Sequence, residues 1–204
     1  MNLDKLVSGI VLAAGKSERM GSSKALLPIF GTTFLKHILN QIQSSRLFET
    51  KVVLGHQSNE ILKRLPEISS VVVINEEYEK GQLSSLQKAI LAIYDGPSEG
   101  LMLFLVDHPL VQLELINGMV RAFSNGKSPI VIPSFEGKRG HPVIFPRELF
   151  SDLLAAPQNQ GAVGVVREHS KKILHLEWKS EVILADVDTP QDYSRFVQQR
   201  TSRG

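Results

Sequence analysis

The residues with the clearest chemical purpose form a loop of small side chains near the N-terminus. Residues 11–24 read Val-Leu-Ala-Ala-Gly-Lys-Ser-Glu-Arg-Met-Gly-Ser-Ser-Lys. The small residues 13–15 and Gly21 let the backbone turn tightly and bring its N–H groups close to an anion. Arg19 and Lys24 add positive charge, and Ser17 adds a hydroxyl group. The combination predicts a site for the phosphate groups of a nucleotide.

This loop is not the phosphate-binding loop of ATPases. Gly15-Lys16-Ser17 matches the end of that motif, but the motif also needs a glycine where Ile10 stands. An ordinary glycine-rich turn between a strand and a helix, with solvated charges, stays open as the alternative.

An acidic residue follows the most apolar run of the chain. Asp107 comes directly after residues 101–106, at the end of an expected central strand, and Pro109 ends the strand. A carboxylate there would hold Mg²⁺ against the phosphates that the first loop binds. A helix cap or a local turn is the alternative role.

A second acidic pair lies late in the chain. Asp186 and Asp188 flank Val187, just past an apolar run, so either carboxylate would complete the same metal site. Asp188 also precedes Thr189-Pro190, a good helix start, so capping and metal ligation are equal alternatives for it.

Two more segments carry candidate binding groups. Residues 81–86, Gly-Gln-Leu-Ser-Ser-Leu, open an expected helix, whose N-terminal N–H groups and hydroxyls would face a nucleotide, with a simple capped helix as the alternative. In Arg139-Gly140-His141-Pro142, His141 would contact a phosphate or orient a second substrate, although a lone histidine is more often structural. Three polar residues past expected strands show no distinctive spacing: His56, Asn75 and His108.

Apolar runs alternate with amphipathic stretches over the first two thirds of the chain, which is the rhythm of β-α-β units. Strands that are apolar throughout are typical of a parallel sheet buried on both faces. We therefore expect an α/β protein of three layers, α/β/α, whose ligands bind beyond the carboxyl ends of the strands. Strands are expected near residues 7–12, 51–54, 71–74, 101–106 and 129–132, and helices near 34–42, 59–65, 83–93 and 113–123.

The pattern changes after Pro133. A strand at 141–145 is followed by helices near 147–154, 162–169 and 191–199. The apolar runs 173–176 and 182–185 are expected to form a small β-rich extension over the sheet. No linker divides the chain, so we expect one domain over 1–204, with a nucleotide-binding half (1–133) and an acceptor-facing half that ends in a helix (134–204).

Composition narrows the function further. The 204 residues are 42% hydrophobic and 22% charged, which is ordinary for a globular protein. The absence of cysteine excludes disulfides and thiolate chemistry and fits a cytoplasmic location. No leader-like N-terminus and no apolar run of membrane-spanning length is present, so a membrane role is not expected. A net charge of +2 with scattered basic residues argues against nucleic-acid binding.

Taken together, the motifs resemble those of the MobA-like nucleotidyltransferases, and the closest branch is the molybdenum cofactor cytidylyltransferases. The motifs are Leu12-Ala-Ala-Gly-x-Ser-x-Arg-Met-Gly-x-x-Lys24, Gly81-Gln-x-x-Ser85-Leu, Asp107-x-Pro109, Gly140-His-Pro-Val143 and Asp186-x-Asp-Thr-Pro190, and they span nearly the whole chain in order. The chain also resembles relatives that serve xanthine dehydrogenase maturation in purine breakdown.

The resemblance implies a Rossmann-like nucleotidyltransferase fold. It also implies transfer of a nucleoside monophosphate from an NTP, with CTP favoured, to the phosphate of a molybdopterin-type acceptor, with Mg²⁺, or Mn²⁺ in its place, as cofactor. By this resemblance the catalytic residues are Arg19, Lys24 and Asp107. The metal is held by Asp107 with Asp186 or Asp188, and the acceptor is bound by Gly140 and His141. Apo-xanthine dehydrogenase is a candidate partner. The implied nucleotide-binding residues are Leu12, Ala13, Ala14, Gly15, Ser17, Gly21, Gly81, Gln82 and Ser85.

One segment departs from the branch. Residues 158–163 read Gln-Asn-Gln-Gly-Ala-Val, where the branch usually has Gly-Asp-x-Gly-Ala-Arg. The missing aspartate and arginine leave two other functions open. One is a sugar-1-phosphate nucleotidyltransferase, and the other is a non-catalytic chaperone that binds the cofactor or the apo-enzyme.

Overall fold

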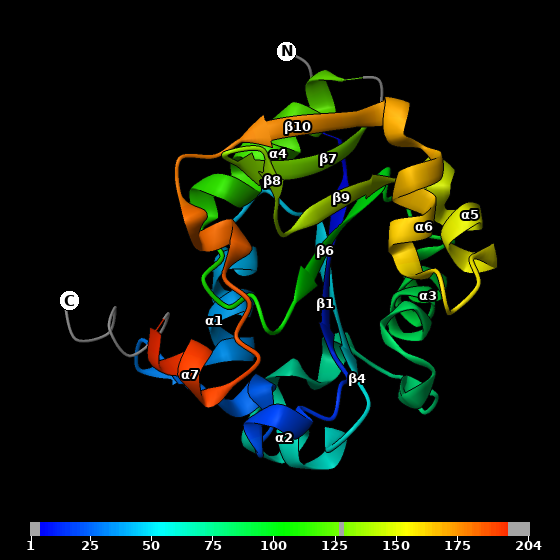
Figure 1. Cartoon of the computed structure of the whole chain (residues 1–204). Coiled ribbons are helices and arrows are strands. Elements are labelled where there is room, and N and C mark those ends of the chain that lie inside the picture. The colour runs from blue at the N-terminus through cyan, green and yellow to red at the C-terminus, as the bar shows by residue number, and fades with distance from the viewer. Residues whose placement is uncertain (1–4, 127–128, 196–204) are drawn as a thin grey trace.

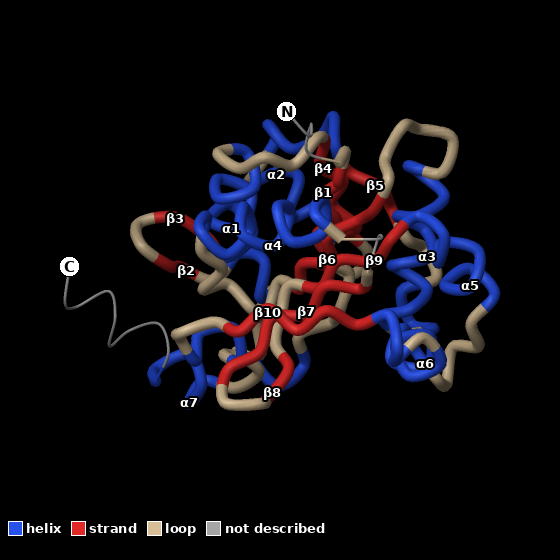
Figure 2. The backbone as a smooth tube through the Cα atoms, turned by 90° about the horizontal axis from the view of Figure 1, so that it is seen from above, coloured by secondary structure: helices blue, strands red, loops and turns tan. Residues whose placement is uncertain are grey.

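The computed structural model describes residues 5–126 and 129–195. A central sheet runs in the order β10-β7-β9-β6-β1-β4-β5, with β8 paired to β7. Helices α1, α2 and α4 cover one face and α3, α5 and α6 cover the other, as the two views show (Figures 1 and 2). The expected three-layer α/β/α architecture is confirmed.

The strands and helices follow the expected runs closely. The sheet strands are β1 (Val7–Ala13), β4 (Glu49–Leu54), β5 (Val72–Ile74), β6 (Gly100–Leu105), β7 (Ile130–Phe135), β8 (Lys138–Arg139), β9 (Val143–Pro146) and β10 (Ile173–Glu177), and a hairpin is formed by β2 (Pro28–Ile29) and β3 (Thr32–Thr33). The α-helices are α1 (Phe34–Gln43), α2 (Ser58–Arg64), α3 (Gln82–Ile93), α4 (Leu113–Asn125), α5 (Phe150–Ala155), α6 (Gly161–Glu168) and α7 (Pro190–Tyr193). The 3-10 helices are η1 (Glu18–Met20), η2 (Lys24–Leu26), η3 (Pro66–Val71), η4 (Tyr78–Lys80), η5 (Arg147–Leu149), η6 (Ser170–Lys172) and η7 (Glu181–Leu184).

The sheet is mostly parallel. β1 pairs in parallel with both β4 and β6, and β10 pairs in parallel with β7. β9 runs antiparallel to β6 and β7, and β8 runs antiparallel to β7. The carboxyl ends of β1 and β6 therefore lie side by side, and the loops that follow them meet at one edge.

The central strand β1 supplies side chains to both cores. All of its residues are buried. Val7 and Val11 pack with the helices of one face, whereas Ile10 and Leu12 pack with those of the other. Side chains alternate across a strand, so a strand buried on both faces is almost wholly apolar, as β1 is. Its buried polar residue, Ser8, forms hydrogen bonds with Glu49 and Ser98.

The second half of the chain holds two differences from expectation. The β-rich extension consists of strands that widen the central sheet instead of lying over it, with β10 at one edge. The strand expected at 182–185 is wrong, because Glu181–Leu184 forms η7. Ser180 starts this turn by accepting a hydrogen bond from the Val182 N–H, and Val182 and Ile183 are buried in the core. A short apolar run fits a buried 3-10 turn as well as a strand.

The C-terminal helix expected at 191–199 is described only in part. Its first turn is α7, and residues 196–199 lie outside the described residues. Within the described part of the chain, none of the helices combines the length and the apolar character needed to cross a bilayer.

Candidate active site

A cavity of about 390 Å³ opens beyond the carboxyl ends of β1 and β6. It brings together the first loop, the start of α3, Asp107 and one of the late aspartates. Its lining includes all of the nucleotide-binding residues expected from the sequence except Gly21. The lining residues among those expected are Leu12, Ala13, Ala14, Gly15, Ser17, Arg19, Lys24, Gly81, Gln82, Ser85, Asp107 and Asp188.

A hydrogen bond from the Lys24 backbone to the Ser17 hydroxyl group links two parts of the first loop. Ser17 has a left-handed backbone with φ of 55°, and its Oγ accepts a hydrogen bond from the Lys24 backbone N–H at 3.1 Å. Gly21, with φ of 68°, ends η1 and lines a neighbouring hollow instead of this cavity. Its contribution is therefore to the turn itself, since a residue with a side chain rarely adopts that backbone conformation.

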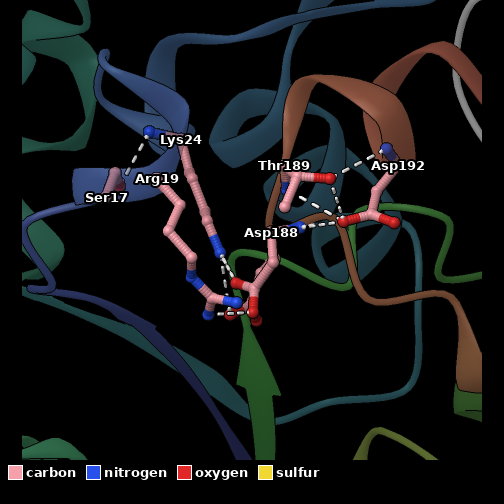
Figure 3. Close-up of polar contacts among 7 residues, drawn as sticks. Ser17, Arg19, Lys24, Asp188, Thr189 and Asp192 are labelled. Carbon is pink, nitrogen blue, oxygen red and sulfur yellow. Dashed lines mark hydrogen bonds and ion pairs between the residues drawn. The ribbon is translucent and has the colours of Figure 1, made fainter.

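Four charged side chains of the cavity lining converge, and Figure 3 shows the contacts among them. The Lys24 ammonium group contacts a carboxylate oxygen of Asp188 and lies 3.4 Å from Oδ2 of Asp107. Arg19 also forms an ion pair with Asp188. The Lys24 side chain is only 9% exposed, whereas Arg19 is 68% exposed. Asp188, which lies late in the chain, thus pairs with both Arg19 and Lys24 of the first loop.

The segment that carries Asp188 is fixed from both sides. Val187 is fully buried, and its N–H donates to the backbone carbonyl of Asp107 at 2.8 Å. Thr189 caps α7 in a reciprocal arrangement with Asp192, whose carboxylate also accepts from the Asp188 N–H (Figure 3). The helix cap considered for Asp188 is therefore wrong, because Thr189 occupies that position.

The two late aspartates lie in different surroundings. Asp188 lines the cavity, and the hydrogen bond from Lys24 lowers the pKa of its carboxyl group below the usual range. Asp186, although exposed as a residue, has its pKa raised by partial burial of the carboxyl group and by the neighbouring charges of Asp107 and Asp188. Asp186 instead groups with Asp107 and His108, and one ligand atom of each lies within 4.8 Å of the others.

His108 is a residue whose place the sequence did not reveal. Its Nδ1 is buried without a hydrogen-bond partner, as is Oδ1 of Asp107. Its ring lies against that of His141, with centroids 4.6 Å apart. Burial lowers the pKa of both rings, that of His141 to about 4, so both are neutral near pH 7. In the sequence, the one indication for His108 was its position after an expected strand.

The start of α3 forms another wall of the cavity. Gly81, with φ of 107°, allows the chain to turn into the helix, and Ser85 lies one turn further on. Asn75, which follows β5, donates hydrogen bonds from Nδ2 to the hydroxyls of Ser84 and Ser85, each at 3.0 Å. Asn75 therefore supports the wall from behind, and its position past a strand was the one hint of this in the sequence.

Two residues of the turn before α3 contact other segments near the cavity. Tyr78 lines the cavity and packs its ring near that of His56. Lys16 forms an ion pair with Glu79 at 2.7 Å between two exposed side chains. Neither Tyr78 nor Glu79 belongs to a recognisable spacing, so sequence reasoning missed both.

A second cavity, of about 470 Å³, adjoins the first and shares Leu12 and Gln82 with it. Its walls are mostly apolar, and its lining includes Gly140 and His141, the two residues predicted to bind the acceptor. The polar side chains of its lining are Gln82, Arg139, His141, Gln158, Asn159 and Gln160. The segment that departs from the family pattern therefore lines this cavity.

Gly140 also has a packing role. A Cβ atom at this position would lie 2.4 Å from the carbonyl oxygen of Ile183. The backbone of His141 donates to that same oxygen at 3.0 Å. The absence of a side chain thus lets the 140–141 loop press against η7, the turn that leads to the late aspartates.

Gln87 of α3 holds the far wall of the second cavity. Its Nε2 lies 3.0–3.3 Å from the carbonyl oxygens of Leu153, Leu154 and Ala156, and its Oε1 accepts from Gln158 at 2.7 Å. One partly buried amide therefore positions the loop between α5 and α6.

Comparison with known proteins agrees with this geometry. A family model described as a MobA-like NTP transferase domain matches residues 9–173. The chain is 26% identical over 189 residues to the molybdenum cofactor cytidylyltransferase of Escherichia coli, covering 90% of this chain and 92% of that protein. It is 28% identical over 193 residues to the purine catabolism protein PucB of Bacillus subtilis, covering 91% and 93%. The crystal structure of Rv0371c from Mycobacterium tuberculosis in complex with manganese superimposes with a TM-score of 0.78 at 26% identity, covering 95% of this chain and 99% of that one.

Proposed function

This chain belongs to the MobA-like NTP transferase family and is a nucleotidyltransferase of that type, and from this premise we propose that it transfers CMP from CTP to the phosphate of molybdopterin cofactor with release of pyrophosphate. The observation that carries the proposal is the pair of adjoining cavities. One is lined by phosphate-binding groups and the other by apolar and amide groups, and Leu12 and Gln82 belong to both. A nucleotide and an acceptor bound in them would meet at that shared wall.

The first cavity suits the triphosphate. Residues 14–17 and the N-terminus of α3 line this cavity, and their backbone N–H groups would donate to phosphate oxygens. Arg19 and Lys24 supply the positive charge, and both would exchange Asp188 for phosphate oxygens when the nucleotide binds. Their charge would then offset the charge that develops on the departing pyrophosphate.

Asp107 and Asp188 are the residues we assign to the divalent metal of this reaction. Both line the cavity, and the Lys24 ammonium group lies between their carboxylates, so the pair already holds a cation. Oxygen ligands of this kind fit Mg²⁺, and Mn²⁺ in its place. Bound there, the ion would supply Lewis-acid charge to phosphate oxygens.

No covalent intermediate is needed in this mechanism. The acceptor phosphate is ionised near pH 7, so it attacks the α-phosphorus directly, and the bond from that phosphorus to the bridging oxygen of pyrophosphate breaks. The residues of the chain contribute position and charge: the first loop holds the leaving group, and the 140–141 loop orients the acceptor.

The acceptor assignment rests on the second cavity. Its apolar walls and its amide side chains would accommodate a flat heterocycle with several donors and acceptors, such as a pterin. Arg139 is the cation available there to the acceptor phosphate. We also propose that residues 1–133 and 134–204 act as nucleotide-binding and acceptor-facing halves of one domain, with Asp188 reaching from the second half to the nucleotide.

The relative named for purine catabolism supports one extension of the proposal. The product would serve the maturation of a molybdoenzyme such as xanthine dehydrogenase, with the apo-enzyme as the protein partner.

The proposal is tested by pyrophosphate release. Purified protein with Mg²⁺ is given CTP, GTP, ATP or UTP in turn, with molybdopterin cofactor or a panel of sugar-1-phosphates as acceptor. We expect release with CTP, and only when molybdopterin cofactor is present. Asp107→Asn is the matched inactive control, with turnover at least about a hundredfold lower.

The other outcomes point elsewhere. Release with a sugar-1-phosphate would make the protein a sugar-activating transferase. Binding of NTP without release in any pair would favour a chaperone that uses the loop only for recognition.

A further inference from the structure

Among the described residues that line the first cavity, Tyr78 is the one with an aromatic side chain. It belongs to η4, the turn before α3, and it is partly buried. The proposed reaction gives Tyr78 no part, since the phosphates and the metal are assigned to charged side chains and backbone N–H groups. An aromatic ring in the wall of a nucleotide cavity therefore needs an explanation of its own.

The order of the strands separates Tyr78 from the charged groups. β1 lies between β6, which Asp107 follows, and β4, which Gly55 follows. Neighbouring strands lie about 4.8 Å apart, so the ends of β4 and β6 are about 10 Å apart. The Tyr78 side chain packs on Gly55, which places it on the β4 side of the cavity. A nucleotide with its phosphates on the β6 side would extend its base toward Tyr78.

We propose that the Tyr78 ring is the surface on which the nucleobase stacks, and that Gly55 beneath it makes room for this ring. The inference rests on the proposed function, since it takes the first cavity to hold a nucleotide, and it deepens that function by assigning the base. Every base has a flat π-face, so stacking on an aromatic ring recognises nucleobases as a class and does not choose among them.

The fit between Gly55 and Tyr78 is close. A Cβ atom at Gly55 would lie 2.7–2.9 Å from Cβ, Cγ and Cδ1 of Tyr78, too close for carbon atoms that are not bonded. The glycine thus lets the side chain lie directly on the backbone at the end of β4. Tyr78 also packs against the core between the sheet and α3, while it lines the cavity. The ring is therefore held on one side and available to a ligand on another.

His56 relates the ring to the first loop. The Tyr78 hydroxyl lies 3.5 Å from Nδ1 of His56, and the two ring centroids are 5.9 Å apart. The His56 backbone N–H donates to the carbonyl of Ala14 at 3.1 Å. The tyrosine is thus connected through one residue to the loop that we assign to the phosphates.

The turn that carries Tyr78 has hydrogen bonds at both of its ends. The Glu77 N–H donates to Oδ1 of Asn75 at 3.0 Å, and the Gly81 N–H donates to the Tyr78 carbonyl at 3.1 Å. A ring that is already in place loses little conformational entropy when a ligand binds, so more of the stacking energy is retained as affinity.

The experiment compares a ligand that has a base with one that lacks it. Each of the four NTPs is titrated calorimetrically into wild type in EDTA, and the one that binds most tightly, expected to be CTP, is carried forward beside inorganic tripolyphosphate. Tyr78→Ala should weaken NTP binding at least about fivefold and leave tripolyphosphate binding unchanged. Tyr78→Phe keeps the ring and should bind the NTP within about twofold of wild type. Tyr94→Ala, at the end of α3 and outside both cavities, is the matched control.

Gly55→Ala tests the same surface while the tyrosine is kept. The new Cβ atom must displace the Tyr78 side chain, so NTP affinity should fall about as far as in Tyr78→Ala, with tripolyphosphate again unaffected. The double variant should bind the NTP no more weakly than Tyr78→Ala alone, because no ring remains to be displaced. Gly118→Ala, on α4, is the control for the added methyl group. Thermal unfolding of each variant checks that it is folded.

Nuclear magnetic resonance reports the contact directly. In perdeuterated protein with protonated tyrosine, nuclear Overhauser effects should join tyrosine ring protons to base protons of the bound NTP. They should vanish in Tyr78→Phe, whose phenylalanine is deuterated, and persist in Tyr94→Ala.

Unchanged NTP affinity in Tyr78→Ala, or an equal loss for the NTP and tripolyphosphate, would overturn the stacking role. Absence of the Overhauser effects in wild type would do the same. Pyrophosphate release is measured in parallel, so turnover with an unchanged KM for CTP in Tyr78→Ala contradicts this inference alone. Stacking of an NTP without transfer to molybdopterin cofactor contradicts only the proposed function, and failure to bind either probe contradicts both.

Discussion

Lys24 and Asp188 form an ion pair between residues 164 positions apart in the sequence. The lysine side chain is 9% exposed and that of the aspartate 23%, so the pair is shielded from solvent more than most surface pairs. It joins the first loop to the last described segment of the chain. The pair also brings together the cation that we propose binds the nucleotide and a proposed metal ligand.

The first prediction concerns the cation. Lys24→Met keeps the length of the side chain and removes its charge, so CTP affinity in the presence of EDTA should fall, and turnover with Mg²⁺ should fall about a hundredfold or more. Binding is measured by calorimetry and turnover by pyrophosphate release. Lys36→Met is the control, because Lys36 pairs with Glu67 away from the cavity. Equal effects of the two substitutions would remove Lys24 from the nucleotide site.

The second prediction is that replacing Asp188, unlike replacing Lys24, does not weaken the binding of CTP. Asp188→Asn removes the anion that competes with the triphosphate for Lys24 and Arg19, so CTP affinity in EDTA should stay equal or rise. Turnover with Mg²⁺ should nevertheless fall about a hundredfold, because a metal ligand is lost. Weaker binding in EDTA together with normal turnover would contradict both assigned roles.

The third prediction is a pH dependence of stability. The pKa of Asp188 is held below its ordinary value of 3.8 by the hydrogen bond from Lys24. A lowered pKa in the folded state means that the pair stabilises the fold above pH 3.8 and loses this contribution as the pH falls through the lowered value. The difference in free energy of unfolding between wild type and Asp188→Asn should therefore be constant near neutral pH and shrink below about pH 4. Urea titrations at several pH values measure it, and a difference that grows on acidification would refute the assignment.

The fourth prediction tests the close approach at Gly140. Gly140→Ala places a Cβ atom 2.4 Å from the Ile183 carbonyl oxygen, so η7 must move. Unfolding free energy should fall by at least about 1 kcal/mol, or about 2–4 °C in Tm for a protein of this size. Gly118→Ala is the control, since its nearest contact would be 3.9 Å away within α4, and it should be neutral or stabilising. The idea fails if both variants melt alike.

The fifth prediction concerns the second cavity, which we propose binds the acceptor. Gln87→Leu removes the amide that holds the loop between α5 and α6, so KM for the acceptor should rise about fivefold or more while the affinity for CTP is unchanged. Lys88→Gln, on the exposed side of α3, is the matched control. If the affinity for CTP falls as well, the substitution affects the fold as a whole and not acceptor binding alone.

Much of this arrangement was available from the sequence. The periodicity of apolar residues predicted the elements of the β-α-β core, because a strand buried on both faces and an amphipathic helix have different patterns. The loop of residues 12–24 and the start of α3 were predicted as cavity walls, since the carboxyl ends of parallel strands share one edge. Both predictions depend on patterns that lie within about a dozen residues of sequence.

The run 182–185 shows where local reasoning fails. Four apolar residues suggested a strand, but the turn capped by Ser180 buries Val182 and Ile183 without any strand partner. Burial selects apolar residues in either conformation, so composition could not decide between them.

The sequence by itself determined that a loop of small and cationic residues and several carboxylates gather at one edge of an α/β sheet, because residue type and strand position are local properties. Only the tertiary structure decided which side chains each late aspartate contacts. Asp186 and Asp188 differ by two positions, yet one joins Asp107 and His108 while the other binds Lys24 and Arg19. That division depends on how Val187 is anchored to the Asp107 carbonyl, 80 residues earlier, and on the cap at Thr189. Contacts between distant segments are set by packing and backbone direction, which no local pattern encodes.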